Sequence, residues 1–389
     1  MILDQAIDGV IGAAVKDNLV PGAVAAVVDS EGLRSIRCCG VRSETSGEPM
    51  TDDTVFQIAS MTKPITGVAC MQAVERGLLE LDRPAGEVIP WLADVQVLDG
   101  FDESGPILHP PENPVTLRNL LTHTSGFTYE IWNSNMAAWI EHTGTPGVGS
   151  RKLASLRRPL SFEPGERWEY GTGMDWAGQL LETVSGMRLG EWMRSEIFEP
   201  LGMFDTAYQC NETMTDRLAA THVLDDGQWN ELASQAPRTL PEFDSGGGGL
   251  HSTTPDYARF IQMLLRGGEL SGQQILSSDT VSAMSSNNMG LLRVSPVISF
   301  NRGLSADFEF MPGIPKSWGL TFQINEETVP GGRRKGSLSW AGLFNTHFWI
   351  DPTSGLGALL MTQTLPFMIP RVAELLDEFE QVVYAAVAS

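Results

Sequence analysis

The sequence predicts an α+β protein in which a β-sheet domain is built from both ends of the chain. Strand-like runs occur within residues 22–59 and again within 336–364, whereas the middle of the chain carries short helical stretches and many prolines. A chain of 389 residues is also long for one domain, on a prior of roughly 150 residues per domain. We therefore expect a sheet domain of residues 1–82 and 215–389 and a mostly helical inserted domain of residues 83–214.

The first 60 residues alternate helix and strand signals. Residues 1–18 place apolar residues at helical spacing and predict an amphipathic helix. Residues 22–41 predict two strands, because two apolar-rich runs flank a turn at 30–32 with the sequence Ser-Glu-Gly. Residues 54–59 predict a further short strand.

A helix is predicted next, from about Ser60 to Arg76. Its apolar residues recur near helical spacing, and Gly77 follows as a stop signal. Pro64 is compatible with this helix only because it lies in the first turns, where its missing N–H costs little.

The rest of the chain supports the same division. Residues 83–165 are dense in proline and offer few strand signals, and residues 174–198 predict a pair of helices. Residues 336–364 predict three strands, the last two joined at Asp-Pro-Thr-Ser-Gly. An amphipathic helix over residues 371–387 closes the chain.

The composition argues against several kinds of partner. The 26 basic and 48 acidic residues give a formal net charge of −22, whereas nucleic acids and anionic membranes attract clustered Lys and Arg. No apolar run approaches the ~18–20 residues that span a bilayer. The acidic N-terminus also lacks the basic region of a signal peptide. We expect a soluble, cytoplasmic protein that binds neither nucleic acid nor membrane, and its oligomeric state stays open.

Neither a metal nor a cofactor is expected from the residue patterns. The four cysteines have no zinc or redox spacing and are predicted to be free thiols: Cys38, Cys39, Cys70 and Cys210. There is no H-E-x-x-H motif, and the glycine tract at 246–249 lacks the strand, helix and lysine of a phosphate loop. We interpret that tract as a loop beside the sheet.

Ser60 and Lys63 form the first candidate for catalysis. At a helix N-terminus the Ser60 N–H has no intrahelical acceptor and can bind an anion. Lys63, three residues later, lies on the same helical face. The amine becomes a base near neutral pH only where burial or a nearby cation lowers its pKa from about 10.4. The alternative is a helix-capping serine followed by a solvated lysine.

Two later segments offer further candidates. Tyr170 follows a Pro-Gly turn and precedes a helix, so its hydroxyl could relay a proton beside a lysine; otherwise its ring is packed and its hydroxyl is wet. Gly342 lies between strand-like runs, where a glycine marks close approach of another chain or a ligand. An edge there could offer the Leu343 N–H as an oxyanion donor with that of Ser60. Trp340 could equally be a core residue.

These motifs, in this order, resemble the serine β-lactamase-like proteins. Ser60-Met-Thr-Lys63, Tyr170-Gly-Thr and Trp340-Ala-Gly match the three motifs of a superfamily that includes class C β-lactamases, D-alanyl-D-alanine carboxypeptidases and family VIII carboxylesterases. Longer segments look similar too, and together they cover most of the chain: DTVFQIASMTKPITG, LLTHTSGFTY, LSFEPGERWEYG, IFEPLGM and SGGGGLHSTTPDYARF. The likeness is greatest to the family VIII esterases.

The resemblance implies an antiparallel sheet flanked by helices, with the site at the interface between this domain and the helical one. It also implies a serine acyl-enzyme, with Ser60 as nucleophile and Lys63 as its activating partner. Tyr170 would pass the proton to the leaving group and then help to activate water. The N–H groups of Ser60 and Leu343 would form the oxyanion hole.

Two departures from the family pattern point to the substrate. Lactamases and peptidases usually carry Asn two residues after the tyrosine, where this chain has Thr172. Their third motif usually begins with Lys or His, and here it is Trp340-Ala-Gly342. Without that cation, the carboxylate of a penicillin or peptide loses a natural partner. We expect Thr172, Trp340 and Gly342 to contact the substrate instead.

The sequence therefore predicts a carboxylesterase acting on small, short-acyl esters. An apolar pocket would be formed by the nearby aromatic residues Phe127, Tyr129, Trp132, Trp168 and Trp340. The alternatives are a β-lactamase or D-amino-acid peptidase, an acyltransferase that uses the same acyl-enzyme, and a non-catalytic binding relative. No serine lies in a G-x-S-x-G elbow. The His-Thr-Gly at 142–144 precedes Tyr170 and is not assigned to the third motif, and His123 is interpreted as structural.

Overall fold

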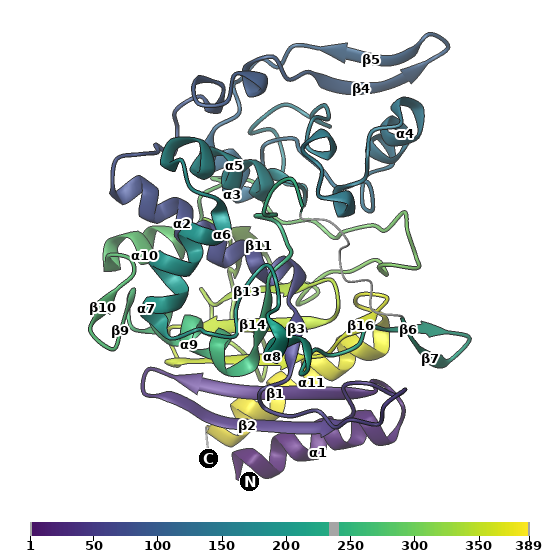
Figure 1. Cartoon of the computed structure of the whole chain (residues 1–389), viewed down its shortest axis with the longest axis vertical. Helices are drawn as coiled ribbons and strands as arrows, with labels where there is room; N and C mark the ends of the chain where they lie inside the picture. Colours follow the sequence, from purple (N-terminus) through teal and green to yellow (C-terminus); the bar gives the residue numbers. More distant parts are fainter. Residues whose placement is uncertain (1, 233–240, 388–389) are drawn as a thin grey trace.

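The computed structural model describes residues 2–232 and 241–387; Met1, 233–240 and 388–389, which fall in the predicted sheet domain, lie outside the described residues. A seven-stranded sheet forms its base, and every neighbouring pair of strands is antiparallel. The strand order is β11-β12-β13-β14-β15-β1-β2, so the two ends of the chain share one sheet (Figure 1). This confirms the predicted α+β class with an antiparallel sheet. The strands span Gly22–Asp29 (β1), Gly32–Gly40 (β2), Lys316–Trp318 (β11), Gln323–Asn325 (β12), Leu338–Gly342 (β13), Thr346–Asp351 (β14) and Leu356–Met361 (β15).

Strand β1 shows why the sheet carries a layer on each face. Its alternate residues belong to two different cores, with Val24 and Val28 in one and Ala25 and Val27 in the other. A strand that is apolar at every position can be buried only in this way. At its end the Asp29 carboxylate accepts hydrogen bonds from the next turn, which is the turn predicted at 30–32.

Two terminal helices cover one face of the sheet. Helices α1 (Leu3–Lys16) and α11 (Pro370–Val387) pack against each other beneath it, close to both chain ends (Figure 1). Both were predicted from their apolar spacing. Helices α2 (Thr62–Glu75) and α9 (Thr254–Leu265) belong to the other, larger core, and α9 packs on β1 and β15.

The middle of the chain contributes the second, mainly helical part of the structure. The predicted helix pair is present as α5 and α6, and α6 continues through a π-helical turn at Arg194–Phe198 into α7. A β4–β5 hairpin in this region was not predicted. Its exposed positions and its Asp-Gly sequence hide the alternation of a strand. The helices and strands here are α3 (Leu117–Thr122), α4 (Ser134–Thr143), α5 (Gly173–Ser185), α6 (Leu189–Met193), α7 (Glu199–Leu201), β4 (Val97–Asp102) and β5 (Gly105–His109).

Shorter elements connect these layers. The predicted strand at 54–59 is β3, which pairs with β8 and so fixes the chain just before Ser60. Among the helices of the described ranges, none is both long and apolar enough to cross a membrane. The domain limits and the cytoplasmic location stay predictions. The remaining elements are β3 (Val55–Gln57), β6 (His222–Asp225), β7 (Gln228–Glu231), β8 (His251–Thr253), β9 (Glu269–Leu270), β10 (Gln273–Gln274), β16 (Thr364–Leu365), α8 (Glu212–Thr215), α10 (Ser278–Met284) and the 3-10 turns Ala59–Met61, Ala85–Glu87, Pro90–Ala93, Val148–Ser150 and Leu153–Ser155.

Candidate active site

A sharp turn places Ser60 at the start of α2. The Ile58 N–H is held by the Leu250 carbonyl at 3.0 Å, and Ala59 then adopts a left-handed conformation with φ 42°. Such a backbone is costly for a residue with a Cβ and is kept only where the surroundings impose it. A 3-10 turn follows, so α2 itself begins at Thr62, two residues later than predicted. Ser60 is left half-buried.

Lys63 is fully buried, because α2 runs through the core and all its residues from Thr62 to Ala73 are buried. Its Nζ lies 3.0 Å from Ser60 Oγ, 3.1 Å from Tyr129 OH and 2.6 Å from the Gly247 carbonyl oxygen. The three N–H donors of an ammonium thus have three acceptors. Two of these acceptors are hydroxyls that can donate instead, so a neutral amine can keep the same three contacts.

Burial lowers the pKa of Lys63 from 10.5 to about 7, and the negative charge of Asp175 opposes this shift. The cause is desolvation: at this buried position the charged amine is removed from water, and no carboxylate in direct contact compensates for the loss. A pKa near 7 leaves much of the amine neutral at neutral pH. The predicted condition for a lysine base is therefore met by its surroundings.

Tyr170 completes the hydrogen bonds to the serine. Its hydroxyl donates to Ser60 Oγ at 2.7 Å and accepts from the indole N–H of Trp340 at 3.2 Å. Burial raises the pKa of Tyr170, and the bonds to Ser60 and Trp340 act in the opposite direction. Lys63 Nζ also lies 4.6 Å from the centre of the Tyr170 ring. The three predicted catalytic side chains therefore meet at one oxygen, Ser60 Oγ.

Strand β13 passes close to the turn that carries Ser60. A Cβ on Gly342 would lie 2.3 Å from the Ile58 carbonyl oxygen, so only glycine allows this approach. Within the described residues, neither the Ser60 N–H nor the Leu343 N–H has a hydrogen-bond acceptor. Both donors are therefore available to a ligand, and their role as the oxyanion hole stays a prediction.

Thr172 and Phe127 lie apart from the hydrogen bonds around Ser60. Thr172 is completely buried, and its hydroxyl has no partner among the described residues. Its contact with substrate stays a prediction. The Phe127 ring packs on Trp91 and Trp176 instead.

The other four predicted aromatic residues belong to one cluster around Tyr170. The ring centres of Tyr129, Trp132 and Trp340 lie 5.3, 5.2 and 4.8 Å from that of Tyr170. Trp168 is connected to them through Trp318, whose ring centre lies 5.5 Å from that of Trp168 and 4.6 Å from that of Trp340.

Sequence reasoning missed the part played by the glycine tract. The Gly247 carbonyl accepts the shortest hydrogen bond of Lys63, and a Cβ there would lie 2.8 Å from both Asp175 Oδ2 and Tyr129 OH. The buried Asp175 carboxylate holds this segment by accepting from Gly247 N at 3.0 Å and Ser245 Oγ at 2.6 Å. A tract of four glycines beside a required backbone carbonyl was the available signal, and it was interpreted as an ordinary loop.

Neither histidine considered from the sequence reaches Ser60 by a hydrogen bond. His123 is buried, accepts weakly from Gly171 N at 3.4 Å and packs edge-on against the Tyr170 ring. Burial and the positive charge of Lys63 keep its pKa well below the usual value. His142 lies in the last turn of α4 against Phe101 of the β4–β5 hairpin. No group of three or more His, Cys, Asp or Glu within the described ranges is arranged to hold a metal ion.

Comparison of the sequence with models of protein families identifies the family of this chain. Residues 7–378 match the family model described as Beta-lactamase. The chain belongs to the β-lactamase family. This confirms the resemblance drawn from the three motifs, and with it the β-lactamase and transpeptidase type of fold.

Relatives within the family include both an esterase and acyltransferases. The chain is 32% identical to the lovastatin esterase of Penicillium rubens, with 97% of each chain covered. It is also 32% identical to the monacolin J acid methylbutanoyltransferase of Aspergillus terreus, covering 96% of this chain and 93% of the other. A solved structure of simvastatin synthase from Aspergillus terreus, a mutant form, superposes with a TM-score of 0.85 at 30% identity, covering 98% and 94% of the two chains. The hydrolase EstCE1, at 21% identity and a TM-score of 0.77 over 98% of both chains, shares the fold.

Proposed function

We propose that the protein is a carboxylesterase that cleaves small, short-acyl esters through an acyl-enzyme on Ser60. The observation that carries this proposal is that Ser60 Oγ is bonded both to a buried lysine whose pKa is lowered to about 7 and to a tyrosine hydroxyl. A serine needs such an adjacent base to act as a nucleophile at neutral pH. The proposal includes a cytoplasmic location for the protein and a small-molecule ester as its substrate, with no cofactor.

Each step moves one proton among these side chains. Ser60 Oγ attacks the ester carbonyl carbon while neutral Lys63 takes the Ser60 proton. The developing oxyanion accepts hydrogen bonds from the Ser60 and Leu343 N–H groups. The C–O bond then breaks, and the proton passes from Lys63 through Tyr170 to the departing alcohol. Water attacks the acyl-enzyme by the same route in reverse, which releases the carboxylic acid and restores Ser60.

The surroundings of Tyr170 favour esters over β-lactams. Trp340, which stands where lactamases and peptidases carry a cation, offers a neutral indole N–H and uses it on Tyr170. Thr172 offers no amide to a substrate side chain. Recognition of a substrate carboxylate at this position would lack its charge-assisted partner, so a β-lactamase or D-amino-acid peptidase is the weaker proposal.

Acyl transfer to an alcohol is the second candidate, and the comparisons support it as much as hydrolysis. Relatives at 32% identity are named as methylbutanoyltransferases as well as an esterase. Both reactions share the acyl-enzyme and differ only in whether water or an alcohol attacks it. The arrangement of Ser60 and its neighbours is compatible with either reaction. Whether water or an alcohol reaches the acyl-enzyme decides between them.

The test compares ester and β-lactam turnover in the parent and in Ser60→Ala. We expect the parent to hydrolyse p-nitrophenyl acetate and butyrate but little nitrocefin, and Ser60→Ala to lose at least 1,000-fold of the ester activity, on the order expected for a nucleophile. A rise in p-nitrophenol release on adding an alcohol, with a new ester formed, would assign transfer. Fast nitrocefin turnover would establish a lactamase. Release of one equivalent without turnover would favour a non-catalytic binding relative.

A further inference from the structure

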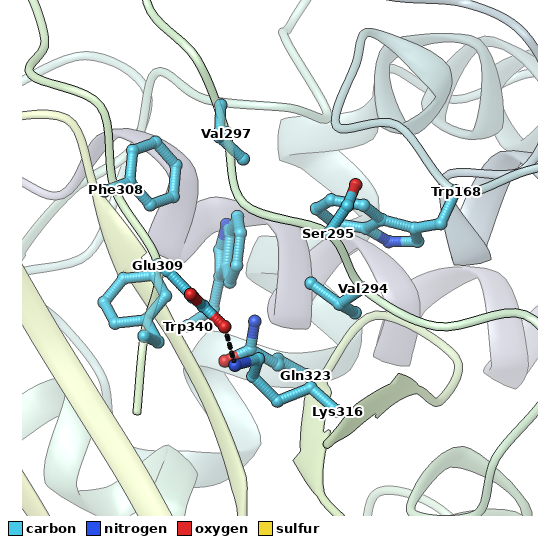
Figure 2. Close-up of a pocket in the computed structure, with 10 residues that line it drawn as sticks. Trp168, Val294, Ser295, Val297, Phe308, Glu309, Lys316, Gln323 and Trp340 are labelled. Carbon is cyan, nitrogen blue, oxygen red and sulfur yellow. Dashed lines mark hydrogen bonds and ion pairs between the residues drawn. The ribbon is translucent and has the colours of Figure 1, made fainter. Parts of the chain in front are cut away.

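A small pocket opens beside Trp340. The space it leaves for a water-sized group is about 10 Å³, and the pocket opens to solvent. Its walls are mainly apolar, formed by Trp168, Val294, Val297, Phe308, Phe310 and Trp340 (Figure 2). Four polar residues, Ser295, Glu309, Lys316 and Gln323, interrupt this lining. This space admits one small polar group, such as a hydroxyl, and not a whole ligand.

Gln323 is one of two residues of this pocket, with Trp168, that have a buried polar atom without a partner among the described residues. Its side chain is 1% exposed, yet Oε1 has no hydrogen-bond partner among the described residues. Its amide nitrogen likewise makes no hydrogen bond within that part of the chain. Figure 2 shows the amide between Trp340, Glu309 and Lys316. A buried amide that is left unsatisfied costs free energy, so its position favours a ligand that hydrogen-bonds to it.

The charges beside Gln323 are balanced. Lys316, 2% exposed, donates to Glu309 Oε1 at 2.7 Å and to the Met311 carbonyl at 3.2 Å. One of its three N–H donors has no acceptor in the described residues, and neither has Glu309 Oε2 a donor. The pair therefore offers a donor and an acceptor but no net charge. Together with the Gln323 amide, this arrangement suits a neutral group that both donates and accepts, which is a hydroxyl.

Trp340 connects this pocket to the proposed chemistry. Its ring forms one wall, and its indole N–H reaches the Tyr170 hydroxyl, which donates to Ser60 Oγ. In the proposed function Tyr170 delivers the proton to the alcohol that leaves. The pocket thus lies on the side of the alcohol part of the ester rather than on the side of the acyl group.

We propose that this pocket binds a hydroxyl group carried by the alcohol part of the substrate, with Gln323 as the residue that selects it. The substrate is then an ester of a small, mainly apolar alcohol that bears a second hydroxyl several atoms from the ester oxygen. This inference rests on the proposed function for the direction of the substrate, and it holds equally when the alcohol is an acceptor in acyl transfer.

The test uses acetate esters that differ at one position. Hydroxyalkyl acetates from 2-hydroxyethyl to 6-hydroxyhexyl are compared with the alkyl acetates in which a methyl group replaces the terminal hydroxyl. We expect the parent to show, at one chain length, a kcat/KM about tenfold higher for the hydroxyl compound, the size of one well-formed hydrogen bond. In Gln323→Met, which keeps the side-chain length without the amide, this preference should disappear. The matched control Gln273→Met lies on the exposed β10 strand and should retain the preference.

A second variant should change which terminal group of the alcohol the pocket prefers. Glu309→Gln leaves Lys316 without its counter-charge, so an acetate ester whose alcohol ends in a carboxylate should gain at least fivefold in kcat/KM relative to the hydroxyl compound. An equal kcat/KM for hydroxyl and methyl compounds at every length in the parent, or an unchanged preference in Gln323→Met, would overturn the proposal and leave water as the only partner of Gln323.

The proposed esterase function and the proposed hydroxyl pocket can be contradicted independently of each other. Absence of Ser60-dependent turnover with phenyl acetate, which carries no second hydroxyl, would contradict the esterase but not the pocket. In that case binding of hexane-1,6-diol and of 1-hexanol is compared through the intrinsic tryptophan fluorescence of the parent and of Gln323→Met. Tighter binding of the diol to the parent alone would support the pocket, and equal binding to both proteins would contradict it.

Discussion

Lys63 and Lys316 are both buried, but they lie in opposite kinds of surroundings. Lys63 contacts two hydroxyls and one backbone carbonyl, and no carboxylate lies in hydrogen-bond contact with it. Lys316 instead contacts the Glu309 carboxylate at 2.7 Å. A buried cation keeps its charge most easily beside an opposite charge, and loses its proton most easily where only neutral dipoles surround it.

The two lysines differ in their contacts rather than in their burial. Burial alone does not produce a base, because both side chains are almost inaccessible to water. The contacts differ: the oxygens around Lys63 are neutral and tolerate loss of a proton, whereas Lys316 forms an ion pair with Glu309. We infer that the first arrangement serves proton transfer and the second serves recognition.

The largest expected effect comes from removing each amine in turn. Lys63→Met should lower kcat/KM for phenyl acetate by about 10²–10⁴-fold, the range of a general base, while the protein stays folded. Lys316→Met should retain at least a tenth of the parent activity, because it does not contact Ser60. The exposed Lys335→Met serves as the control for loss of a lysine. Near-parental activity in Lys63→Met, or an equal loss of kcat/KM in Lys63→Met and Lys316→Met, would contradict the distinction between the two lysines.

The three side chains that meet at Ser60 Oγ could be predicted because Ser60-Met-Thr-Lys63 and Tyr170-Gly-Thr resemble motifs of the β-lactamase family. Only the contact between Ser60 and Lys63 follows from local geometry, since Tyr170 lies 110 residues from Ser60. Lys63 follows Ser60 by one helical turn, and Gly342 marks a close backbone approach that only glycine permits. The strands β1, β2 and β13–β15 and both terminal helices were also predictable, since apolar periodicity is a local property.

Other contacts of the site arise from segments far apart in sequence. The Gly247 carbonyl and the Tyr129 hydroxyl lie 184 and 66 residues from Lys63, and no local pattern joins them. The β4–β5 hairpin was missed for a different reason, because its apolar residues occur in pairs, such as Val97 and Leu98, and do not alternate with polar residues. The pairing of Lys316 with Glu309 in a pocket depends on the fold and could not be read from spacing.

Trp340 contacts Tyr170 beside Lys63 and also lines the pocket that contains Lys316, so its substitution tests whether the two sites act separately. Trp340→Phe removes the N–H donated to Tyr170 and should lower kcat for phenyl acetate about 3–10-fold, the worth of one hydrogen bond. The matched control is Trp318→Phe, because the Trp318 indole N–H is buried and has no partner among the described residues. Steady-state kinetics that show an equal loss in both variants would reduce the role of Trp340 to packing.

The pH dependence of activity sharpens the description of Lys63. Because the neutral amine is the proposed base, kcat/KM should rise with pH through about 7 and level off above it. Asp175 raises the pKa of Lys63, so Asp175→Asn should move this rising limb to lower pH while the amide oxygen can still accept from Gly247. Rate profiles from pH 5 to 9 measure the shift, with the exposed Asp102→Asn as control. A limb that stays in place, or moves to higher pH, would contradict the assignment of this limb to Lys63.

Glu309→Gln should have a smaller effect on phenyl acetate turnover but should make the surroundings of Lys316 resemble those of Lys63. The buried ammonium then loses its counter-charge, so the free energy of unfolding at pH 7 should fall by about 1–3 kcal/mol, less than for a fully buried pair because Glu309 is 32% exposed. Urea unfolding of the variant, the parent and the exposed control Glu327→Gln measures this. Equal stability of all three proteins would mean that neutral oxygens hold a buried lysine as well as a carboxylate does, and the contrast between the two sites would no longer explain their different tasks.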